Sequence, residues 1–224
     1  MGYFLETLVK LIPFLRVTIY IAVWAMILGL IFGTLLAAMK LSGSRFLKKI
    51  AELFTTLIRC TPVIVLLFLS YYGLPLLFGI VGLDISNGSK TAFSIAALTV
   101  YSSATLSEII RPAYLSINKG QMEAALTVGL TTLQAMVTVI LPQVVFVALP
   151  NMGNMLIALF QESALAYLIG VIDVMGQAKV INSMNYGAHI IEVYFAVSLL
   201  YWMLSLLTGK FVDMLTYRFS KIMK

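Results

Sequence analysis

Cysteine and histidine are nearly absent from this sequence, which contains one cysteine, Cys60, and one histidine, His189, in 224 residues. A single cysteine cannot form an intrachain disulfide, and it leaves no CxxC pair for a metal ion. A single histidine likewise leaves no cluster of histidine ligands. The sequence therefore predicts neither a disulfide framework nor a metal site in this chain.

Charged side chains are also scarce, at 11% of the residues, while 61% are hydrophobic and the mean hydropathy is +1.02. A soluble domain of this size rarely has so apolar a composition, because its surface must face water. The charges cluster and leave long uncharged windows. Such windows are typical of membrane spans, because a charge at the centre of a span costs roughly 3 kcal/mol. The composition predicts a membrane protein.

Motifs for several other functions are missing. The net charge of +6 is not accompanied by a basic–aromatic module, so no nucleic-acid partner is expected. No GxxxxGK[ST] phosphate loop occurs, so no P-loop nucleotide site is expected in this chain. Ser163 and His189 are the best available nucleophile–base pair, but they are distant in sequence and Ser163 lacks a G-x-S-x-G elbow. We expect no catalytic residues.

Five apolar windows are long enough to cross a bilayer as helices, at about 1.5 Å per residue. We place these spans at 17–39, 60–83, 91–107, 144–160 and 193–209, in an all-α membrane protein with a single transmembrane domain. The preceding Met1–Arg16 is amphipathic, and the first apolar run is too long for a cleavable signal peptide. Gly29 and Gly33 have GxxxG spacing, which permits close helix packing, although glycine is tolerated in spans generally.

Residues 124–161 contain no charge and are long enough for two spans, but their first half is too polar to face lipid comfortably. We therefore expect surface helices over 118–142 and only one span after them. A sixth span would place the C-terminal basic cluster outside, against the preference of positive charge for the cytoplasmic side. With five spans and the N-terminus outside, four basic residues lie outside: Lys10, Arg16, Lys90 and Lys179. The other eleven lie on the cytoplasmic side with the C-terminus: Lys40, Arg45, Lys48, Lys49, Arg59, Arg111, Lys119, Lys210, Arg218, Lys221 and Lys224.

The segment 118–142 contains signals for two short helices and a turn. Asn118 and Thr131 can each cap a helix, and each has a glutamine at the third position of a capping box. Gly129 suits the left-handed residue that ends the first helix, and Pro142 can close the segment before the next span. The pattern predicts a cytoplasmic helix–turn–helix. Its first helix can form an apolar face with Met122, Ala125 and Leu126, while Glu123 points another way.

In this segment the sequence resembles the permease subunits of ABC importers, whose signature is EAA, three residues, Gly, nine residues and I-x-L-P. Val139 replaces the isoleucine, and the matching residues are Glu123, Ala124, Ala125, Gly129, Leu141 and Pro142. The resemblance implies a type I ABC importer permease fold, in which this loop is a coupling helix that docks on a cytoplasmic ATPase dimer. ATP and magnesium would be carried by that ATPase, with no cofactor on this chain. The small alanines allow close approach, and Glu123 offers charge-assisted bonds.

From about Val17 to the C-terminus the sequence resembles the polar amino-acid permeases in particular. Their second span begins with a pattern like FRGTPLLVQLFLIYYGLP. Here Cys60 and Leu66 replace the usual glycine and glutamine, while Arg59, Thr61, Pro62 and Tyr71–Pro75 match. Further matching stretches are 101–111, 119–121, 148–154 and 161–165. The resemblance implies an ATP-driven importer of the histidine, glutamine, arginine or cystine type, in the bacterial inner membrane.

This resemblance also implies partners and a mechanism. The partners are a second permease copy or a sibling, an extracytoplasmic amino-acid-binding protein and the amino-acid solute, which crosses by alternating access. The residues leave open which amino acid is carried. They also leave open an ABC permease for another small polar solute. An ATP-independent channel is a further alternative, although no repeated filter loop or charged ring is present.

Polar groups inside a membrane are candidates for the solute route. Glu162, at the outer end of the fourth span, can face an ammonium or guanidinium group. Asn151 and Asn154 lie on one helical face beside Pro150, whose missing N–H leaves a carbonyl free. Alternatively, the asparagines bond neighbouring helices, Glu162 sits in interfacial water, and Tyr71 belongs to an aromatic belt rather than to the route. For Arg59 and Glu108 we expect structural roles, through snorkelling or pairing.

Overall fold

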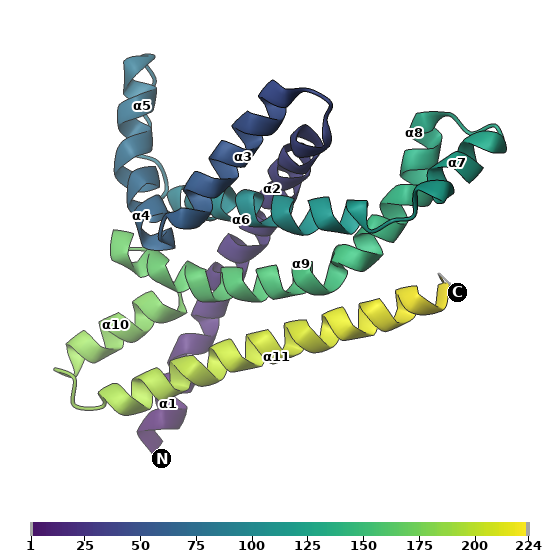
Figure 1. The fold of residues 1–224 in the computed structure, drawn as a ribbon. Helices are drawn as coiled ribbons and strands as arrows, with labels where there is room; N and C mark the ends of the chain where they lie inside the picture. The colour runs from purple at the N-terminus through teal and green to yellow at the C-terminus, as the bar shows by residue number, and fades with distance from the viewer. Residues whose placement is uncertain (1, 223–224) are drawn as a thin grey trace.

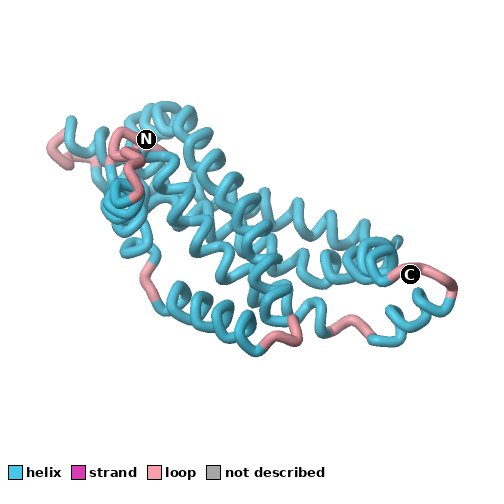
Figure 2. The backbone as a smooth tube through the Cα atoms, turned by 90° about the horizontal axis from the view of Figure 1, so that it is seen from above, coloured by secondary structure: helices cyan, strands magenta, loops and turns pink. Residues whose placement is uncertain are grey.

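The computed structural model describes residues 2–222, and these residues form helices and short connections without any strand. Lys224, one of the basic residues counted above, lies outside the described residues. Figure 1 shows the order of the helices, and Figure 2 shows that only short loops join them. The helices are α1 (Gly2–Leu11), α2 (Leu15–Leu41), α3 (Arg45–Cys60), α4 (Val63–Phe68), α5 (Leu74–Ile80), α6 (Lys90–Leu115), α7 (Lys119–Thr127), α8 (Thr132–Ala135), α9 (Leu141–Ser163), α10 (Val174–Met184) and α11 (Ile190–Ile222).

Five helical stretches are long and apolar enough to cross a membrane, which confirms the predicted all-α architecture. They comprise Gly2–Leu41, Val63–Ile80, Lys90–Leu115, Thr132–Ile169 and Ile190–Lys221. Four of the five extend beyond the spans expected from the apolar windows. The second is shorter, because Thr61 and Pro62 are extended and interrupt the helix.

The first stretch begins fifteen residues before the predicted span. A single 3-10 turn, Ile12–Phe14, joins α1 to α2 and contains Pro13, whose missing N–H cannot continue the α-helical bonding of α1. Leu11 is fully buried in a cluster with α10 and α11. This packing keeps the amphipathic N-terminal segment helical. The apolar window could not predict this, because the packing is a tertiary effect.

Of the prolines inside continuous helical stretches, two lie two residues after a π turn. Leu69–Gly73 forms a π turn before Pro75, and Met136–Ile140 forms one before Pro142. A proline ring clashes with the carbonyl four residues earlier, and the wider π turn relieves that clash by adding a residue. For this reason the helix continues through Pro142, whereas the sequence indicated that this proline closes the segment. Residues 132–142 are therefore continuous with the fourth membrane stretch.

Helices α2 and α6 form the central packed pair of the molecule. A Cβ placed on Gly29 would lie 2.0 Å from the Ser102 Oγ, and one on Gly33 would lie 2.9 Å from the Leu106 Cβ. The absence of side chains at these two glycines lets the helix backbones approach each other. The GxxxG spacing therefore marks a real helix contact within this chain, which confirms the packing interpretation.

An ion pair joins the same two helices near the end of α2. The Lys40 side chain is 2% exposed, and its Nζ donates to Glu108 Oε1 at 2.6 Å and to Ser107 Oγ at 3.0 Å. A buried cation without a partner would be strongly destabilising, so these bonds are needed to keep Lys40 inside. The pairing of Glu108 confirms its expected structural role.

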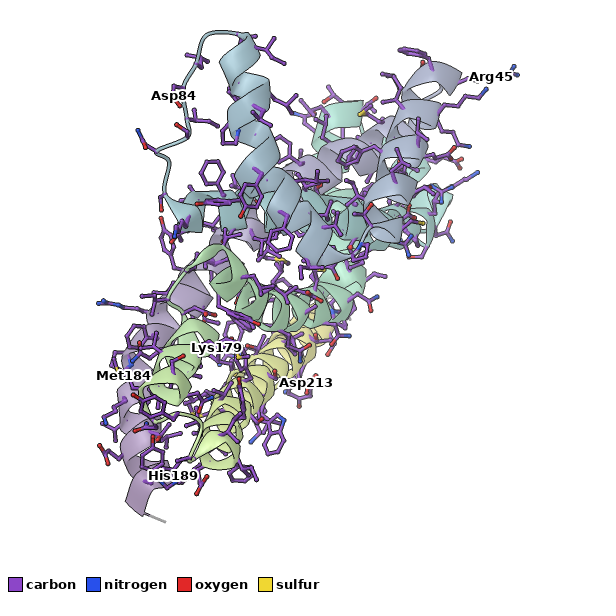
Figure 3. The ribbon with its side chains drawn as sticks, turned by 90° about the vertical axis from the view of Figure 1, so that its left-hand side faces the viewer. Arg45, Asp84, Lys179, Met184, His189 and Asp213 are labelled. Atoms are coloured by element: carbon purple, nitrogen blue, oxygen red, sulfur yellow. The ribbon has the colours of Figure 1, made fainter. Side chains whose placement is uncertain are left out.

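The N-terminal helix and the segment between α9 and α11 lie at the same end of the molecule. Tyr3 stacks on His189 with ring centroids 3.9 Å apart, and its hydroxyl accepts a hydrogen bond from the Asn185 amide. Figure 3 shows Lys179, Met184 and His189 at this end, beside α1. Figure 1 shows α7, α8 and the end of α11 at the opposite end. This arrangement fits a chain that crosses a membrane an odd number of times.

Candidate functional site

The helix α7, which carries the EAA motif, is defined by its two caps. At its start the Asn118 Oδ1 accepts a hydrogen bond from the Gly120 N–H at 2.9 Å. At its end Gly129 has a φ of +91°, and the two bonds of a Schellman cap are present. These run from Gly129 N to Leu126 O at 3.0 Å and from Leu130 N to Ala125 O at 3.2 Å. The predicted glycine turn is confirmed.

A capping box starts the second short helix, α8, as the sequence predicted. The Thr131 Oγ1 accepts from the Gln134 N–H at 3.3 Å, and the Gln134 Oε1 accepts from the Thr131 N–H at 2.9 Å. Each residue thus satisfies a backbone donor that the first turn of a helix leaves free. The turn between α7 and α8 is therefore specified by local hydrogen bonds.

The residues of the EAA motif point in two directions. Ala125 is 5% exposed, and Met122 packs against a small cluster that contains Ala113, Ile140 and Val144. Glu123 and Ala124 are exposed, as are the later motif residues Leu141 and Pro142. Leu126 is 42% exposed, so it does not belong to the buried apolar face for which the sequence made it a candidate. One alanine anchors the helix, and the carboxylate and the other alanine remain available to a partner.

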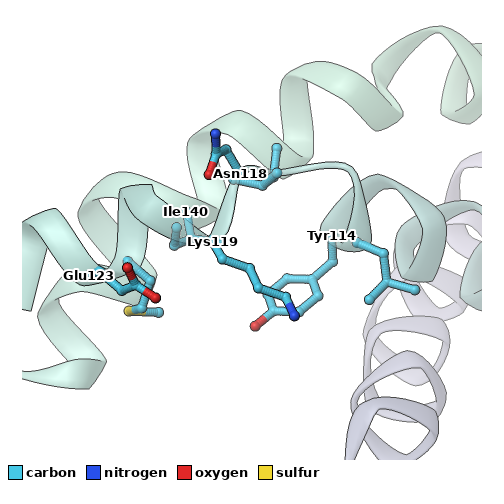
Figure 4. A pocket seen from close by; sticks show the side chains of 8 residues that line it. Tyr114, Asn118, Lys119, Glu123 and Ile140 are labelled. Atoms are coloured by element: carbon cyan, nitrogen blue, oxygen red, sulfur yellow. The ribbon is translucent and has the colours of Figure 1, made fainter.

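A cavity of about 330 Å³ lies between α7, the end of α6 and the start of the fourth membrane stretch. Figure 4 shows Tyr114, Asn118, Lys119, Glu123 and Ile140 around it. Its other lining residues are Leu115, Ile117 and Met122. An apolar floor with a charged margin can receive an apolar side chain of a protein partner while the charges pair around it.

The candidate solute residues on α9 share one helical face. Asn151 and Glu162 are eleven residues apart, which is about three helical turns, and Asn154 lies between them on nearly the same side. Both asparagines are exposed within this chain, and Glu162 is half-buried. Pro150 lies inside α9 beside them. The structure therefore brings these three polar side chains onto a single face that the described helices leave partly open.

Tyr71 is not on that helix. It belongs to the π turn of the second stretch, and its aromatic neighbours are Phe93, 5.6 Å away between ring centroids, and Tyr72, 4.9 Å away. The hydroxyl of Ser70, the preceding residue, donates to the Phe93 carbonyl at 2.8 Å. These contacts describe a residue packed into the central core, and its role in the solute route stays a prediction.

Asp173 is a buried acid that the sequence patterns did not single out. Its Oδ1 accepts from the Gly176 N–H at 2.9 Å, which caps α10, and its Oδ2 lies 3.4 Å from the hydroxyls of Thr18 and Tyr201. Burial outweighs these bonds and raises the pKa of this carboxyl to about 6. An aspartate before an apolar helix signals a cap, but nothing local indicates contacts with two distant helices.

The chain matches a known family over most of its length. Residues 25–221 match the family described as "Binding-protein-dependent transport system inner membrane component". Among curated proteins, the L-cystine transport system permease protein TcyL of Bacillus subtilis is 35% identical over 98% of this chain and 90% of its own length. The probable amino-acid ABC transporter permease protein PatM of Vibrio harveyi is 39% identical, over 90% and 87%. The glutamate/aspartate import permease protein GltK of Escherichia coli is 31% identical, over 95% and 96%.

Solved structures share the fold. A crystal structure of an amino acid ABC transporter with histidines matches with a TM-score of 0.78 and 32% identity, over 97% of this chain and 96% of that chain. An inward-facing MetNI methionine ABC transporter matches with a TM-score of 0.72 over 98% and 99%, and its 22% identity speaks for the fold alone. The chain therefore belongs to the inner-membrane component family of binding-protein-dependent transport systems, as a multi-pass ABC importer permease subunit that leaves ATP hydrolysis to a separate subunit.

Proposed function

We propose that this permease subunit serves an importer of polar amino acids and forms the solute path by alternating access. The observation that carries the proposal is the polar face of α9, where Asn151, Asn154 and Glu162 share one side of a largely apolar membrane helix. Amides and a carboxylate can bond the ammonium and carboxylate groups that every amino acid carries. The relatives named above, which are described as cystine, glutamate/aspartate and amino-acid permeases, support the same substrate class.

The partner on the cytoplasmic side is a dimeric ABC ATPase, which binds ATP and magnesium. It docks on α7, where Glu123 and Ala124 are exposed next to the cavity at Lys119 and Tyr114. A helix with well-formed caps at both ends transmits a displacement better than a loose loop, because its ends cannot fray. The Gly129 turn and the Thr131 box supply that rigidity.

A second permease, either an identical copy or a sibling, completes the solute path. The polar face of α9 is exposed in the single chain, and polar side chains in a membrane avoid lipid by facing another protein surface or a water-filled route. We infer that this face meets the second permease, with the solute between the two. In the alternative interpretation, the asparagines bond that neighbour directly and Glu162 remains in interfacial water.

The orientation in the membrane follows from charge and from chain direction. The basic residues favour a cytoplasmic location for the α7–α8 end and the C-terminus. The N-terminus, which packs beside His189, then lies outside, together with α10. The outer end is the side on which the extracytoplasmic amino-acid-binding protein delivers its ligand.

The test is reconstitution of the permease with its ATPase and its binding protein in proteoliposomes. Uptake of labelled amino acids should require ATP, both partners, and an amino acid that the binding protein recognises. Uptake of a different class of small polar solute, with all amino acids excluded, would contradict the substrate class while leaving the ABC importer intact. Flux that persists without the ATPase would support a channel instead.

A further inference from the structure

Asp173 joins three helices at the end of the molecule that carries the N-terminus. It lies between the fourth and fifth membrane stretches, at the first residue before α10, and its side chain is 0% exposed. One oxygen caps α10 through the Gly176 N–H at 2.9 Å. The other lies 3.4 Å from Thr18 of α2 and 3.4 Å from Tyr201 of α11. A single carboxylate thus connects α10 to the first and last membrane helices.

Hydrogen-bond donors stabilise the ionised form of this carboxylate. In the described part of the chain, no basic side chain contributes to that stabilisation. Tyr201 is the titratable group that faces it. The charged side chains near this end of the surrounding helices have other environments. Glu6 pairs with Lys10 at 2.6 Å in α1, and Glu192 of α11 meets His189 at 3.3 Å. Arg16 of α2 and Lys179 of α10 are exposed.

The outer surface of α10 and of the turn after it is open. Lys179 is exposed, Met184 is 74% exposed, and Tyr186 is 99% exposed with a left-handed φ of +50°. Aromatic residues and methionine are enriched on protein-binding surfaces, and Tyr186 and Met184 are both exposed here. The position of this surface relative to the membrane helices depends on the contacts at Asp173.

We propose that Asp173 is a positioning residue for the extracytoplasmic face: its hydrogen bonds hold α10 against α2 and α11 and so set the surface that meets the binding protein. The identification of the partner rests on the proposed function. The three-helix connection at Asp173 does not, because it concerns contacts within this chain.

The connection should respond to pH, and linkage determines the sign. The pKa of Asp173 is about 6 when α10 is docked, against an ordinary 3.8 when it is exposed, so the docked form binds the proton more tightly. Lowering the pH through 6 therefore favours docking, and raising it favours release of α10. Between pH 7.5 and pH 5 the equilibrium for opening α10 should fall by about tenfold.

Hydrogen exchange of the amides in residues 174–184, corrected for the intrinsic pH dependence of exchange, measures this opening. In the wild-type complex, protection should be about tenfold higher at pH 5 than at pH 7.5. Asp173→Asn keeps the cap but cannot ionise, so its protection should not change with pH. Tyr201→Phe removes one donor to the charged form, so it should lower protection at pH 7.5 and have little effect at pH 5. The same pH dependence in wild type and Asp173→Asn would overturn the positioning role.

The link to the partner has its own readout. Asp173→Ala removes the cap and both side-chain contacts, so the opening equilibrium of α10 should rise about fivefold. The concentration of loaded binding protein that half-stimulates ATPase activity should rise with it, by up to the same factor. An unchanged half-stimulating concentration, despite lower α10 protection, would overturn the assignment of this surface to the binding protein. Wild-type ATPase activity that no binding protein stimulates would contradict the proposed function instead.

Discussion

Glu123 and Ala125 are two residues apart on α7, yet the carboxylate is exposed while the alanine is buried. Residues two apart on a helix lie on different faces, so a short helix can be anchored by one and recognised through the other. The importance of Glu123 lies in this exposure, because a charge on a docking surface affects the partner more than it affects the fold.

Glu123→Arg should leave the permease folded and inserted while weakening its association with the ATPase. Reversal of a charge that pairs across an interface costs on the order of 1.5–3 kcal/mol, roughly ten- to a hundredfold in affinity. Co-purification and binding-protein-stimulated ATPase activity would measure it. Glu52→Arg is the matched control, since Glu52 is exposed on α3 and only 3.9 Å from Lys48 in a solvated pair. Equal co-purification of both variants at wild-type yield would remove Glu123 from the docking surface.

Glu162→Gln tests the solute route, because it keeps the shape of the side chain and removes its charge. If the carboxylate meets a cationic part of the solute, the half-saturation constant for transport should rise roughly ten- to a hundredfold, or about 1.5–3 kcal/mol. Transport should be measured across substrate concentration in proteoliposomes. Glu6→Gln changes an exposed carboxylate paired with Lys10 and should alter little. An unchanged half-saturation constant and maximal rate for Glu162→Gln would assign this residue a structural role.

Among the elements, the pair α2 and α6 depends on two glycines, because a side chain at either position would meet the opposite helix. Around Gly33 the nearest atoms include the Ser103 carbonyl oxygen, 3.0 Å from where a Cβ would lie. A backbone atom cannot move aside by changing rotamer, so any side chain must push the helices apart. This tight contact also holds Ser107 and Glu108 in reach of Lys40.

Gly33→Ala should therefore destabilise the permease by about 1–3 kcal/mol through overpacking between α2 and α6. Thermal unfolding in detergent, compared with wild type under identical conditions, measures the effect. Gly209→Ala is the matched control, because Gly209 lies in α11 with no atom within 4 Å of a Cβ. There, alanine should be neutral or stabilising by about 0.5–1 kcal/mol. Equal melting temperatures for the Gly33→Ala variant and wild type would contradict close packing.

At the scale of the whole molecule, an odd number of crossings separates the N-terminal end from the α7–α8 end. The helices α6, α9 and α11 run between those two ends in alternating directions (Figure 1). The N-terminal helix shares its end with α10, so the sidedness of any one loop fixes that of the others. The loop around Asn87 lies outside and the loop around Gly43 lies inside if the basic residues have the orientation proposed here.

Single cysteines at these loops test the orientation. Asn87→Cys in a Cys60→Ser background should react with an impermeant thiol reagent added to intact cells, whereas Gly43→Cys should react only after the membrane is opened. Both positions are exposed in the folded chain, so burial does not limit either reaction, and the native Cys60 is exposed as well. The reverse labelling pattern would invert the proposed topology and place α10 in the cytoplasm.

Much of this protein could be predicted from its sequence, because the decisive interactions are local or depend on the solvent. Uncharged windows predict membrane helices, since lipid offers no partner to a charge or to a free backbone group. The ends of α7 and α8 depend on residues within a few positions of each other, as at Thr131 with Gln134 and at Gly129. The EAA spacing and the span-two pattern then identified the family, although the roles of Glu123, Asn151, Asn154, Glu162 and Tyr71 stay predictions.

Only the tertiary structure decided which polar groups are buried together and where the helices continue. Lys40 meets Glu108 across 68 positions and Asp173 meets Thr18 across 155, and no local pattern encodes contacts at such separations. The helix runs through Pro142, because the preceding π turn makes room for its ring, and α1 stays helical because it packs on α11. Local sequence sets hydrophobicity, caps and turns; the energy of burying a charge depends on the partners that folding brings to it.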